Sequence, residues 1–260
     1  MRASPGGSTG SGSPRRRRRA RLAGPMDDVW EIPPSALEAL PAFPLTNVVL
    51  LPGMVLPLNV FEPRYVALAD ALERGPGYVG VPLVRDPTLA MDDAPPTARI
   101  FGVGRMTAHR RLPDGRRFLR VHGLRRVVVR REHPRSTPYR IFATELLPEP
   151  PLREAALAEI LVTQLERIAT TLESCEQEIV RAVAAIPDPR MLAYAVTAIL
   201  PALGLAVPQG DDAGPGHVWI QQQCLEADDT DARFRLLIEQ TGVITGVLGE
   251  SGRFPRVMFN

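Results

Sequence analysis

The sequence predicts an α+β fold in which a β-rich half precedes a helical half. Between Pro41 and Pro150, short apolar or alternating runs are separated by turn signals such as Pro113-Asp114-Gly115. After Pro150, apolar residues instead recur every three or four positions, as on one face of a helix. The chain therefore changes from strands to helices near its middle.

The β-rich half is expected to form a barrel of about six short strands with one inserted helix. Closure, complete or nearly so, is favoured because it removes exposed strand edges. The helix is predicted to begin at Glu62-Pro63, with proline in its first turn, and to stop at Gly75. The predicted strands cover residues 48–51, 78–84, 99–107, 116–121, 125–131 and 139–147.

The helical half is predicted to begin with one long amphipathic helix over residues 157–186. At 1.5 Å per residue such a helix is about 45 Å long. It could pack within its own bundle or mediate self-association. Asp188-Pro189 has the pattern of an N-cap that opens a second helix through Leu200. A last helical region, 219–248, is expected to break near 227–230.

These patterns give three segments: a disordered Arg/Gly/Ser/Pro-rich tail (1–28), the β-barrel (38–150) and a helical subdomain (151–250). Met26 could equally be the true start of the protein. The Arg15–Arg19 run would bind nucleic acid or anionic surfaces non-specifically, but no apolar stretch follows it as in a secretory signal. No run of about 18 apolar residues indicates a membrane span, so we expect a cytoplasmic protein.

The composition excludes several chemistries. All 31 basic side chains are arginine, so no lysine can act as a base, Schiff-base former or phosphate ligand. Cys175 and Cys224 lie far apart in helical patterns and are expected to be buried, inert thiols. No metal-binding spacing links the four histidines, which are His109, His122, His133 and His217. Nor does the sequence indicate a small-molecule site. We predict no catalytic residue, metal or cofactor.

Charge is divided along the chain. Between Arg105 and Arg140 twelve arginines face only Asp114 and Glu132, a formal excess of ten. From Ile141 onward, 17 acidic residues outnumber eight arginines. The basic stretch could bind RNA phosphates, or it could form ion pairs with the acidic helical half.

The first half carries a long motif. It consists of Phe43-Pro44-Leu45, a Pro52-Gly53 turn joining two apolar strands, and Phe61-Glu62-Pro63-Arg64-Tyr65 at the start of the helix. Glu62 and Arg64 are expected to tie the strand–helix junction with a charge-assisted hydrogen bond. This segment resembles the opening of the substrate-binding N-terminal domain of Lon-type ATP-dependent proteases.

Later segments agree with that resemblance. The stretches that match the family pattern are Asp114-Gly115, Gly123-Leu124-Arg125-Arg126-Val127, Tyr139-Arg140-Ile141, Gln223-Cys224-Leu225-Glu226, and Arg233 with Leu236-Leu237. The pattern departs at Cys224, where leucine is common. The resemblance covers roughly residues 40–248 and implies a PUA-like β-barrel followed by a helical subdomain.

The resemblance also implies what the chain does not do. In the full protease this domain precedes an ATPase with a Walker loop and a peptidase with a Ser-Lys dyad, and both motifs need lysine. The 260 residues contain none. We therefore expect a non-catalytic module.

Two functions remain open at this stage. By resemblance, the chain is expected to bind unfolded or tagged client proteins and to act with a separate ATPase or protease. The candidate contact residues, which could also be core and turn formers, are Phe43, Pro44, Leu45, Phe61, Glu62, Arg64 and Tyr65. The alternative is an RNA-binding PUA-like protein that uses Arg116, Arg117, Arg120, Arg125 and Arg126.

Overall fold

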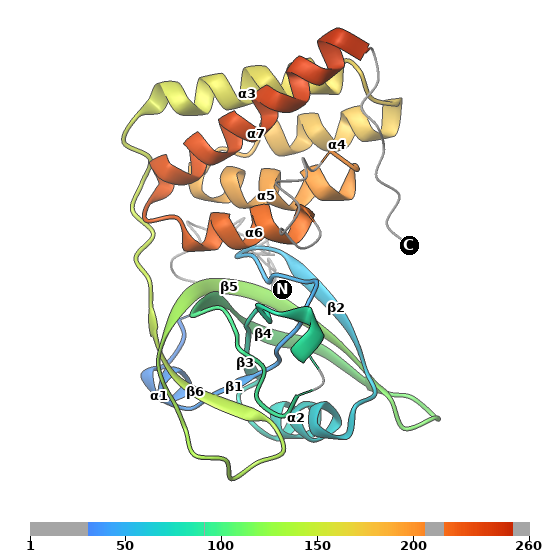
Figure 1. Ribbon diagram of the computed structural model, residues 1–260, viewed down its shortest axis with the longest axis vertical. Coiled ribbons are helices and arrows are strands. Elements are labelled where there is room, and N and C mark those ends of the chain that lie inside the picture. The colour runs from blue at the N-terminus through green and yellow to red at the C-terminus, as the bar shows by residue number, and fades with distance from the viewer. Residues whose placement is uncertain (1–30, 91, 206–215, 252–260) are drawn as a thin grey trace, which may run out of the picture. The chain divides into compact units, whose positions relative to one another are not determined.

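The computed structural model describes residues 31–90, 92–205 and 216–251, with strands in its first half and helices in its second (Figure 1). The predicted tail, 1–28, lies outside the described residues. The strands are β1 (Leu40–Ala42), β2 (Val55–Val60), β3 (Tyr78–Val81), β4 (Ile100–Arg111), β5 (Arg117–Glu132) and β6 (Arg140–Leu146). The helices are α1 (Pro34–Glu38), α2 (Pro63–Arg74), the 3₁₀ helix η2 (Pro87–Leu89), α3 (Ala155–Ala169), α4 (Ser174–Ala184), α5 (Pro189–Ala202), α6 (Gly216–Glu226) and α7 (Thr230–Ser251).

The six strands form one mixed sheet in the order β2-β5-β4-β3-β1-β6. β5 also pairs with β6, so the sheet closes on itself through β5. The β1–β3 pairing is parallel and the others are antiparallel. The predicted α+β class and the closed sheet are confirmed.

Helix α2 covers the inner side of the β2–β5–β4 part of the sheet. Its buried residues are Tyr65, Leu68, Ala69 and Leu72, and they pack in one cluster with Leu58, Val60, Leu119 and Val121. The predicted junction contact is present, since Arg64 Nε donates to Glu62 Oε2 at 2.9 Å. The predicted limits of this helix, Pro63 and Gly75, are also confirmed.

The predicted strand at 48–51 is wrong, because this segment is a buried loop between β1 and β2. It crosses the backbones of β4 and β5 where both lack a side chain. A Cβ on Gly102 would lie 1.8 Å from the Leu50 carbonyl oxygen, and one on Gly123 would lie 2.1 Å from that of Leu51. The glycines therefore permit a close crossing in place of strand pairing.

Two other strand predictions also need correction. The separate strands at 116–121 and 125–131 are one continuous strand, β5, because Gly123 serves the close approach of Leu51 and makes no turn. β1 was not predicted, and β2 was expected only as the apolar strand after Pro52-Gly53. β1 is three residues long, too short for alternation to reveal.

The predicted long helix, 157–186, is in fact two helices, α3 and α4. The hydroxyls of Thr170 and Thr171 donate back to the Arg167 and Ile168 carbonyls, each at 2.7 Å. These bonds satisfy the carbonyls at the end of α3, and Glu176 then accepts from the backbone N–H of Glu173 at the start of α4. The break removes the continuous heptad surface on which self-association had been considered. The start of α5 after Asp188 and the break between α6 and α7 agree with prediction.

A buried carboxylate links the sheet to the helices. Glu149, in the segment between β6 and α3, accepts from Arg126 Nε of β5 at 3.0 Å and from Arg233 Nη1 of α7 at 2.6 Å. Its Oε1 also accepts from the Tyr194 hydroxyl of α5 at 2.8 Å. The exposed fraction of the side chain is 2% for Arg126 and 0% for Arg233. One carboxylate thus forms ion pairs with two arginines from different halves of the fold.

Arg126 adds neutral contacts to this junction. Its Nη1 donates to the carbonyl oxygens of Leu225 at 2.7 Å and Ala227 at 2.5 Å, both at the end of α6. The carbonyls at a helix C-terminus carry partial negative charge, so a guanidinium stabilises that end. An apolar cluster surrounds the same contact and includes Val49, Leu51, Tyr194, Val218, Cys224 and Leu225.

The two cysteines differ in exposure. Cys224 is buried as predicted, but Cys175 lies exposed at the start of α4, so its predicted burial is wrong. The prediction assumed that one helix with one buried face runs through Cys175. Because α3 ends at Ala169 and α4 begins at Ser174, the apolar spacing of α3 does not decide which residues of α4 are buried. Burial raises the pKa of the Cys224 thiol to about 11.

The first prediction concerns Glu149. Replacing Glu149 by Gln leaves two buried guanidiniums without a counter-charge and should lower the free energy of unfolding by about 3–5 kcal/mol. The matched control is Glu145→Gln, which removes the partner of Arg130 in an exposed pair and should cost less than about 1 kcal/mol. Urea unfolding followed by circular dichroism measures both; equal losses would show that the buried cluster is not a stabilising centre.

The second prediction concerns the loop crossing. Gly123→Ala should lower the free energy of unfolding by roughly several kcal/mol, because the added methyl group overpacks the crossing and the Leu51 backbone must move. Gly246→Ala is the control, since nothing lies within 4 Å of a Cβ there, and alanine in helix α7 should stabilise by about 0.5–1 kcal/mol. Thermal melts compare the two. A neutral Gly123→Ala would contradict the close crossing.

The third prediction concerns thiol reactivity. In the native protein a thiol reagent such as DTNB should modify Cys175 rapidly and Cys224 only after denaturation, because the thiolate is the reactive form. Cys175→Ser should abolish the rapid phase. Rapid modification of both thiols in the native wild type would mean that Cys224 is accessible.

Candidate functional site

An open groove of about 310 Å³ lies where the loop before β2 meets the helices. The loop and the start of β2 form one wall, and Ala198 of α5 and Gln221 of α6 lie on the other. The remaining lining residues are Asn47, Val48, Val49, Leu50, Leu51, Met54, Val55 and Leu56. The lining is apolar except for two amide side chains, which suits apolar side chains of a partner.

The groove exists because of the glycine crossing described above. Gly102 and Gly123 allow Leu50 and Leu51 to lie against the sheet. Val49 and Leu51 then pack into the apolar cluster under the helices. Val48 and Val55 remain partly or fully exposed at the groove. The loop thus contributes alternately to the core and to the groove.

The outer side of β2 continues from this groove. Val55, Pro57 and Asn59 are exposed, whereas the alternate residues Leu58 and Val60 are buried. Phe61 follows at the end of the strand. Its exposed fraction is 69% and that of Val55 is 45%; among the described large hydrophobic residues Phe61 is the most exposed. Two apolar side chains therefore flank one strand beside an apolar groove.

The seven candidate protein-contact residues divide by burial. Phe43, Pro44 and Tyr65 are buried, which favours the core role over the contact role that the sequence had left open. Phe43 and Tyr65 stack at 4.2 Å between ring centroids, and the Tyr65 hydroxyl donates to the Pro44 carbonyl at 3.3 Å. Burial raises the pKa of Tyr65. Leu45 is half-buried beside this core.

The other three candidates lie at the strand–helix junction. Glu62 and Arg64 form an ion pair with each other, in which Arg64 Nη2 lies 2.8 Å from Glu62 Oε2. Arg64 Nη1 also donates to the Asp92 carbonyl at 3.2 Å. Phe61 alone of the seven is a largely exposed apolar side chain.

The basic stretch is mostly neutralised within the protein. Eight of its twelve arginines form ion pairs with described carboxylates, among them Arg116 with Asp114 at 2.7 Å and Arg117 with Asp70 at 3.1 Å. Most partners belong to the β-rich half, so pairing mainly with the acidic helical half is wrong. The partner carboxylates come from helices α1 and α2, from neighbouring strands and from connecting segments.

The five candidate RNA-contact residues also divide. Arg126 is buried at the junction with Glu149, and Arg125 is half-buried with an Nε atom that has no hydrogen-bond partner among the described residues. Arg116 and Arg117 are paired as described above. Arg120 is exposed and makes no ion pair with a described carboxylate. The five do not form one basic surface.

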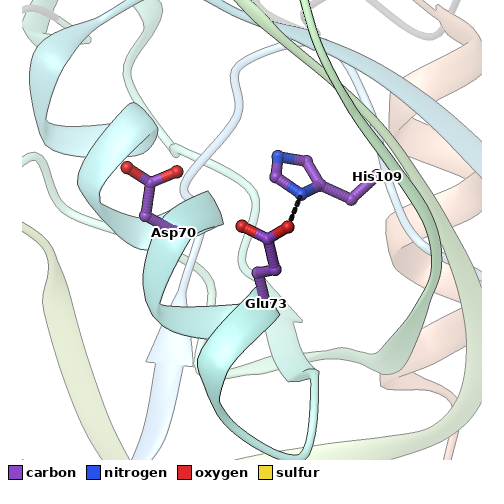
Figure 2. Close-up of side chains that lie close together, drawn as sticks. All are labelled: Asp70, Glu73 and His109. Atoms are coloured by element: carbon purple, nitrogen blue, oxygen red, sulfur yellow. Dashed lines mark ion pairs between the residues drawn. The ribbon is translucent and has the colours of Figure 1, made fainter.

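Asp70, Glu73 and His109 form the one group with metal-ligand spacing among the described residues, and Figure 2 shows them between α2 and β4. His109 Nδ1 lies 3.1 Å from Glu73 Oε1, and His109 Nε2 has no hydrogen-bond partner in the described structure. The candidate ligand atoms lie within 4.8 Å of one another. No metal had been predicted here, because residues from two separate elements come together.

Two arginines already occupy these carboxylates. Arg117 Nε donates to Asp70 at 3.1 Å, and Arg111 Nη2 donates to Glu73 at 2.7 Å. These hydrogen bonds lower the pKa of Asp70 and of Glu73. A divalent cation would have to displace both guanidiniums, so the cluster serves better as an ion-pair clamp between the β4–β5 hairpin and α2.

The other histidines show no comparable group. His133 Nε2 lies 2.8 Å from the Glu38 carbonyl, and His122 is half-buried on β5. The side chain of His217 lies outside the described residues. In the described part of the chain no helix combines the length and apolarity needed to cross a membrane.

Sequence reasoning did not single out the residues that line the groove. Val48 had been assigned to a strand, Val55 and Leu56 belonged to the apolar strand expected after Pro52-Gly53, and Ala198 and Gln221 come from distant helices. Alternation along β2 could have indicated that Val55 is exposed. No sequence signal could have brought Ala198 and Gln221 to the same groove.

Comparison with known proteins supports one family. Residues 39–203 match the model of the ATP-dependent protease La (LON) substrate-binding domain. The chain is 31% identical over 169 residues to Lon protease of Roseiflexus castenholzii, covering 64% of this chain and 20% of that protein. It is 31% identical over 219 residues to Lon protease 2 of Sorangium cellulosum, covering 81% of this chain and 25% of that protein. The chain thus spans a fifth to a quarter of the length of these relatives.

Solved structures show the same fold. A Lon N-terminal domain protein from Xanthomonas campestris aligns with a TM-score of 0.52 at 24% identity, covering 77% of this chain and 97% of that one. The N-terminal domain of Mycobacterium avium complex Lon protease aligns with a TM-score of 0.58 at 19% identity, covering 78% and 98%. The family match covers all six strands and helices α2 to α5, and it shows that the chain belongs to the Lon substrate-binding domain family.

Proposed function

We propose that this protein binds extended segments of unfolded or tagged client proteins without cleaving them. The observation that carries the proposal is the open apolar groove beside β2, with exposed Val55 and Phe61 next to it. The family description, a substrate-binding domain, supports the same role. A separate ATP-dependent protease or unfoldase would then act on the client.

The groove suits weak, sequence-tolerant binding. Burying one client Leu or Phe side chain contributes about 1.5–3 kcal/mol. A groove of this size takes few such side chains, and association itself costs several kcal/mol. The expected dissociation constant for a single segment is therefore in the micromolar to millimolar range. Such affinity lets a client be released to a downstream enzyme.

The groove residues cannot perform hydrolysis. Its lining, as far as the described residues go, contains no Ser, Cys, His, Asp or Glu, and its polar members are Asn47 and Gln221. An amide lacks both the nucleophile and the titratable base that peptide hydrolysis requires. The sequence also lacks the lysine of the Ser-Lys dyad. Binding without cleavage is the role that these groups support.

The prediction uses two exposed valines as a matched pair. Val55→Asp places a carboxylate at the groove and should weaken binding of an uncharged Leu/Phe-containing peptide about tenfold or more, because the charge must be desolvated. Val243→Asp on α7, where the exposed fraction is 43% against 45% for Val55, should change the affinity less than about twofold. Fluorescence anisotropy with a labelled peptide measures both affinities.

A second pair tests the apolar residue beyond β2. Phe61→Ser should weaken binding of the same peptide, whereas Ile179→Ser on α4 should leave it unchanged. Circular dichroism melts confirm that each variant is folded. If the wild-type protein does not bind the peptide, or if Val55→Asp and Val243→Asp behave alike, the groove is not the client site.

A further inference from the structure

The outer faces of β2, β5 and β4 together form an exposed surface that continues from the groove. The pairing register aligns Pro57 with Arg120 and Ala108, and it aligns Asn59 with Phe118 and Arg110. Residues in register on neighbouring strands point to the same side of a sheet. The members of this ribbon face are Val55, Pro57, Asn59, Phe118, Arg120, His122, Ala108 and Arg110. The exposed Phe61 follows directly after the last residue of β2.

Burial confirms which side is outside. Arg120 and Arg110 are exposed, whereas Leu119 and Val121, which alternate with Arg120 on β5, have exposed fractions of 1% and 0%. Arg111 and Arg117, one register position away, face α2 and pair with Glu73 and Asp70. The two sides of one ribbon thus differ: the inner arginines are neutralised and the outer ones are not.

The two outer arginines have no counter-charge. Neither Arg110 nor Arg120 makes an ion pair with a carboxylate of the described residues, although the fold supplies carboxylates to eight neighbouring arginines. Arg110 lies over the Phe118 ring at 5.9 Å, which holds its guanidinium above the strands. The ribbon face therefore combines positive charge with the exposed apolar side chains of Val55, Pro57 and Phe61.

We propose that the ribbon face selects client segments in which apolar side chains are flanked by Asp or Glu. This inference rests on the proposed client-binding function and adds the chemistry of the client. The apolar side chains would lie on Val55, Pro57 and Phe61 and in the adjoining groove. Client carboxylates would then meet the guanidiniums of Arg110 and Arg120.

The observations favour a peptide over a nucleic acid. A phosphate backbone is held by several arginines or lysines at once, and affinity falls with each contact that is missing. The ribbon face offers only two guanidiniums that make no ion pair with a described carboxylate. Val55 and Pro57 have no flat surface for a base to stack on, and the Phe118 ring lies under the Arg110 guanidinium, so Phe61 is left as a single exposed ring beside them, where single-strand binders stack successive bases on several rings. Nor is the client expected to extend the sheet at β2, because Pro57 lacks the N–H that a strand pairing would use.

The experiment compares three labelled peptides with one Leu/Phe core and either acidic, neutral or basic flanks. The full-length wild type should bind the acidic peptide tightest, since two exposed ion pairs change affinity by roughly 2- to 30-fold. Arg110→Glu with Arg120→Glu should reverse the order of the acidic and basic peptides. Arg130→Glu with Arg131→Glu on β5, outside the ribbon face, changes the net charge equally and should keep the wild-type order.

The outcomes separate the two proposals. Binding of the neutral peptide with no preference for acidic flanks would overturn this inference and leave client binding intact. Absence of binding by all three peptides would overturn client binding itself. Equal loss of preference in both double variants would assign the effect to net charge and overturn the ribbon face.

A single-stranded RNA oligonucleotide tests the nucleic-acid alternative. If the RNA binds more tightly than the acidic peptide, and Arg110→Glu with Arg120→Glu abolishes that binding, the ribbon face binds nucleic acid and the inference is overturned. Melting temperatures near wild type establish that the variants are folded.

Discussion

The carboxylate of Glu149 is the interaction on which the arrangement of the two halves depends. It forms ion pairs with Arg126 from the sheet and with Arg233 from the last helix, and it accepts a hydrogen bond from the Tyr194 hydroxyl of α5. Burial and the nearby negative charge of Glu149 raise the pKa of Tyr194 well above its usual value, so this hydroxyl remains a donor. Two arginines buried without this carboxylate would each carry a large desolvation penalty. The connecting segment must therefore place Glu149 between the halves.

The segment around Glu149 is held in place by further contacts to the same helix. Thr230 donates to the Pro150 carbonyl at 2.5 Å, and Asp231 accepts from the backbone N–H of Glu154 at 2.9 Å. Because Thr230 and Asp231 both lie at the start of α7, these two hydrogen bonds hold the segment before α3 against the start of α7. The groove depends on this junction because Ala198 and Gln221 reach it from α5 and α6.

Two glycines of the sheet determine where the loop before β2 lies and thereby shape the groove. Gly102 and Gly123 let the Leu50 and Leu51 backbone cross the sheet closely, and the loop then presents Val48 and Val55 at the groove. The absence of side chains at these two positions thus allows the loop to form one wall of the groove. The fold of the loop and the shape of the groove therefore depend on the same glycines.

The sequence by itself determined the division into a β-rich half and a helical half, the limits of α2, the start of α5 after Asp188 and the Glu62–Arg64 contact. These features follow from periodicity, caps and neighbours in sequence, which are local properties. The absence of lysine likewise excluded the Ser-Lys and Walker chemistries in these residues without any structure.

Only the tertiary structure decided which candidates are surface residues. Phe43 and Tyr65 have the composition of a contact site but stack inside the sheet, whereas Phe61 from the same motif is exposed. Arginines that are equivalent in sequence became buried, paired or free according to which side of β5 they occupy and which carboxylate lies opposite. That outcome depends on strand register and on contacts between residues far apart in the chain, such as Arg126 with Leu225. Local sequence patterns do not predict such long-range contacts, so the groove and the ribbon face can be identified only in the folded structure.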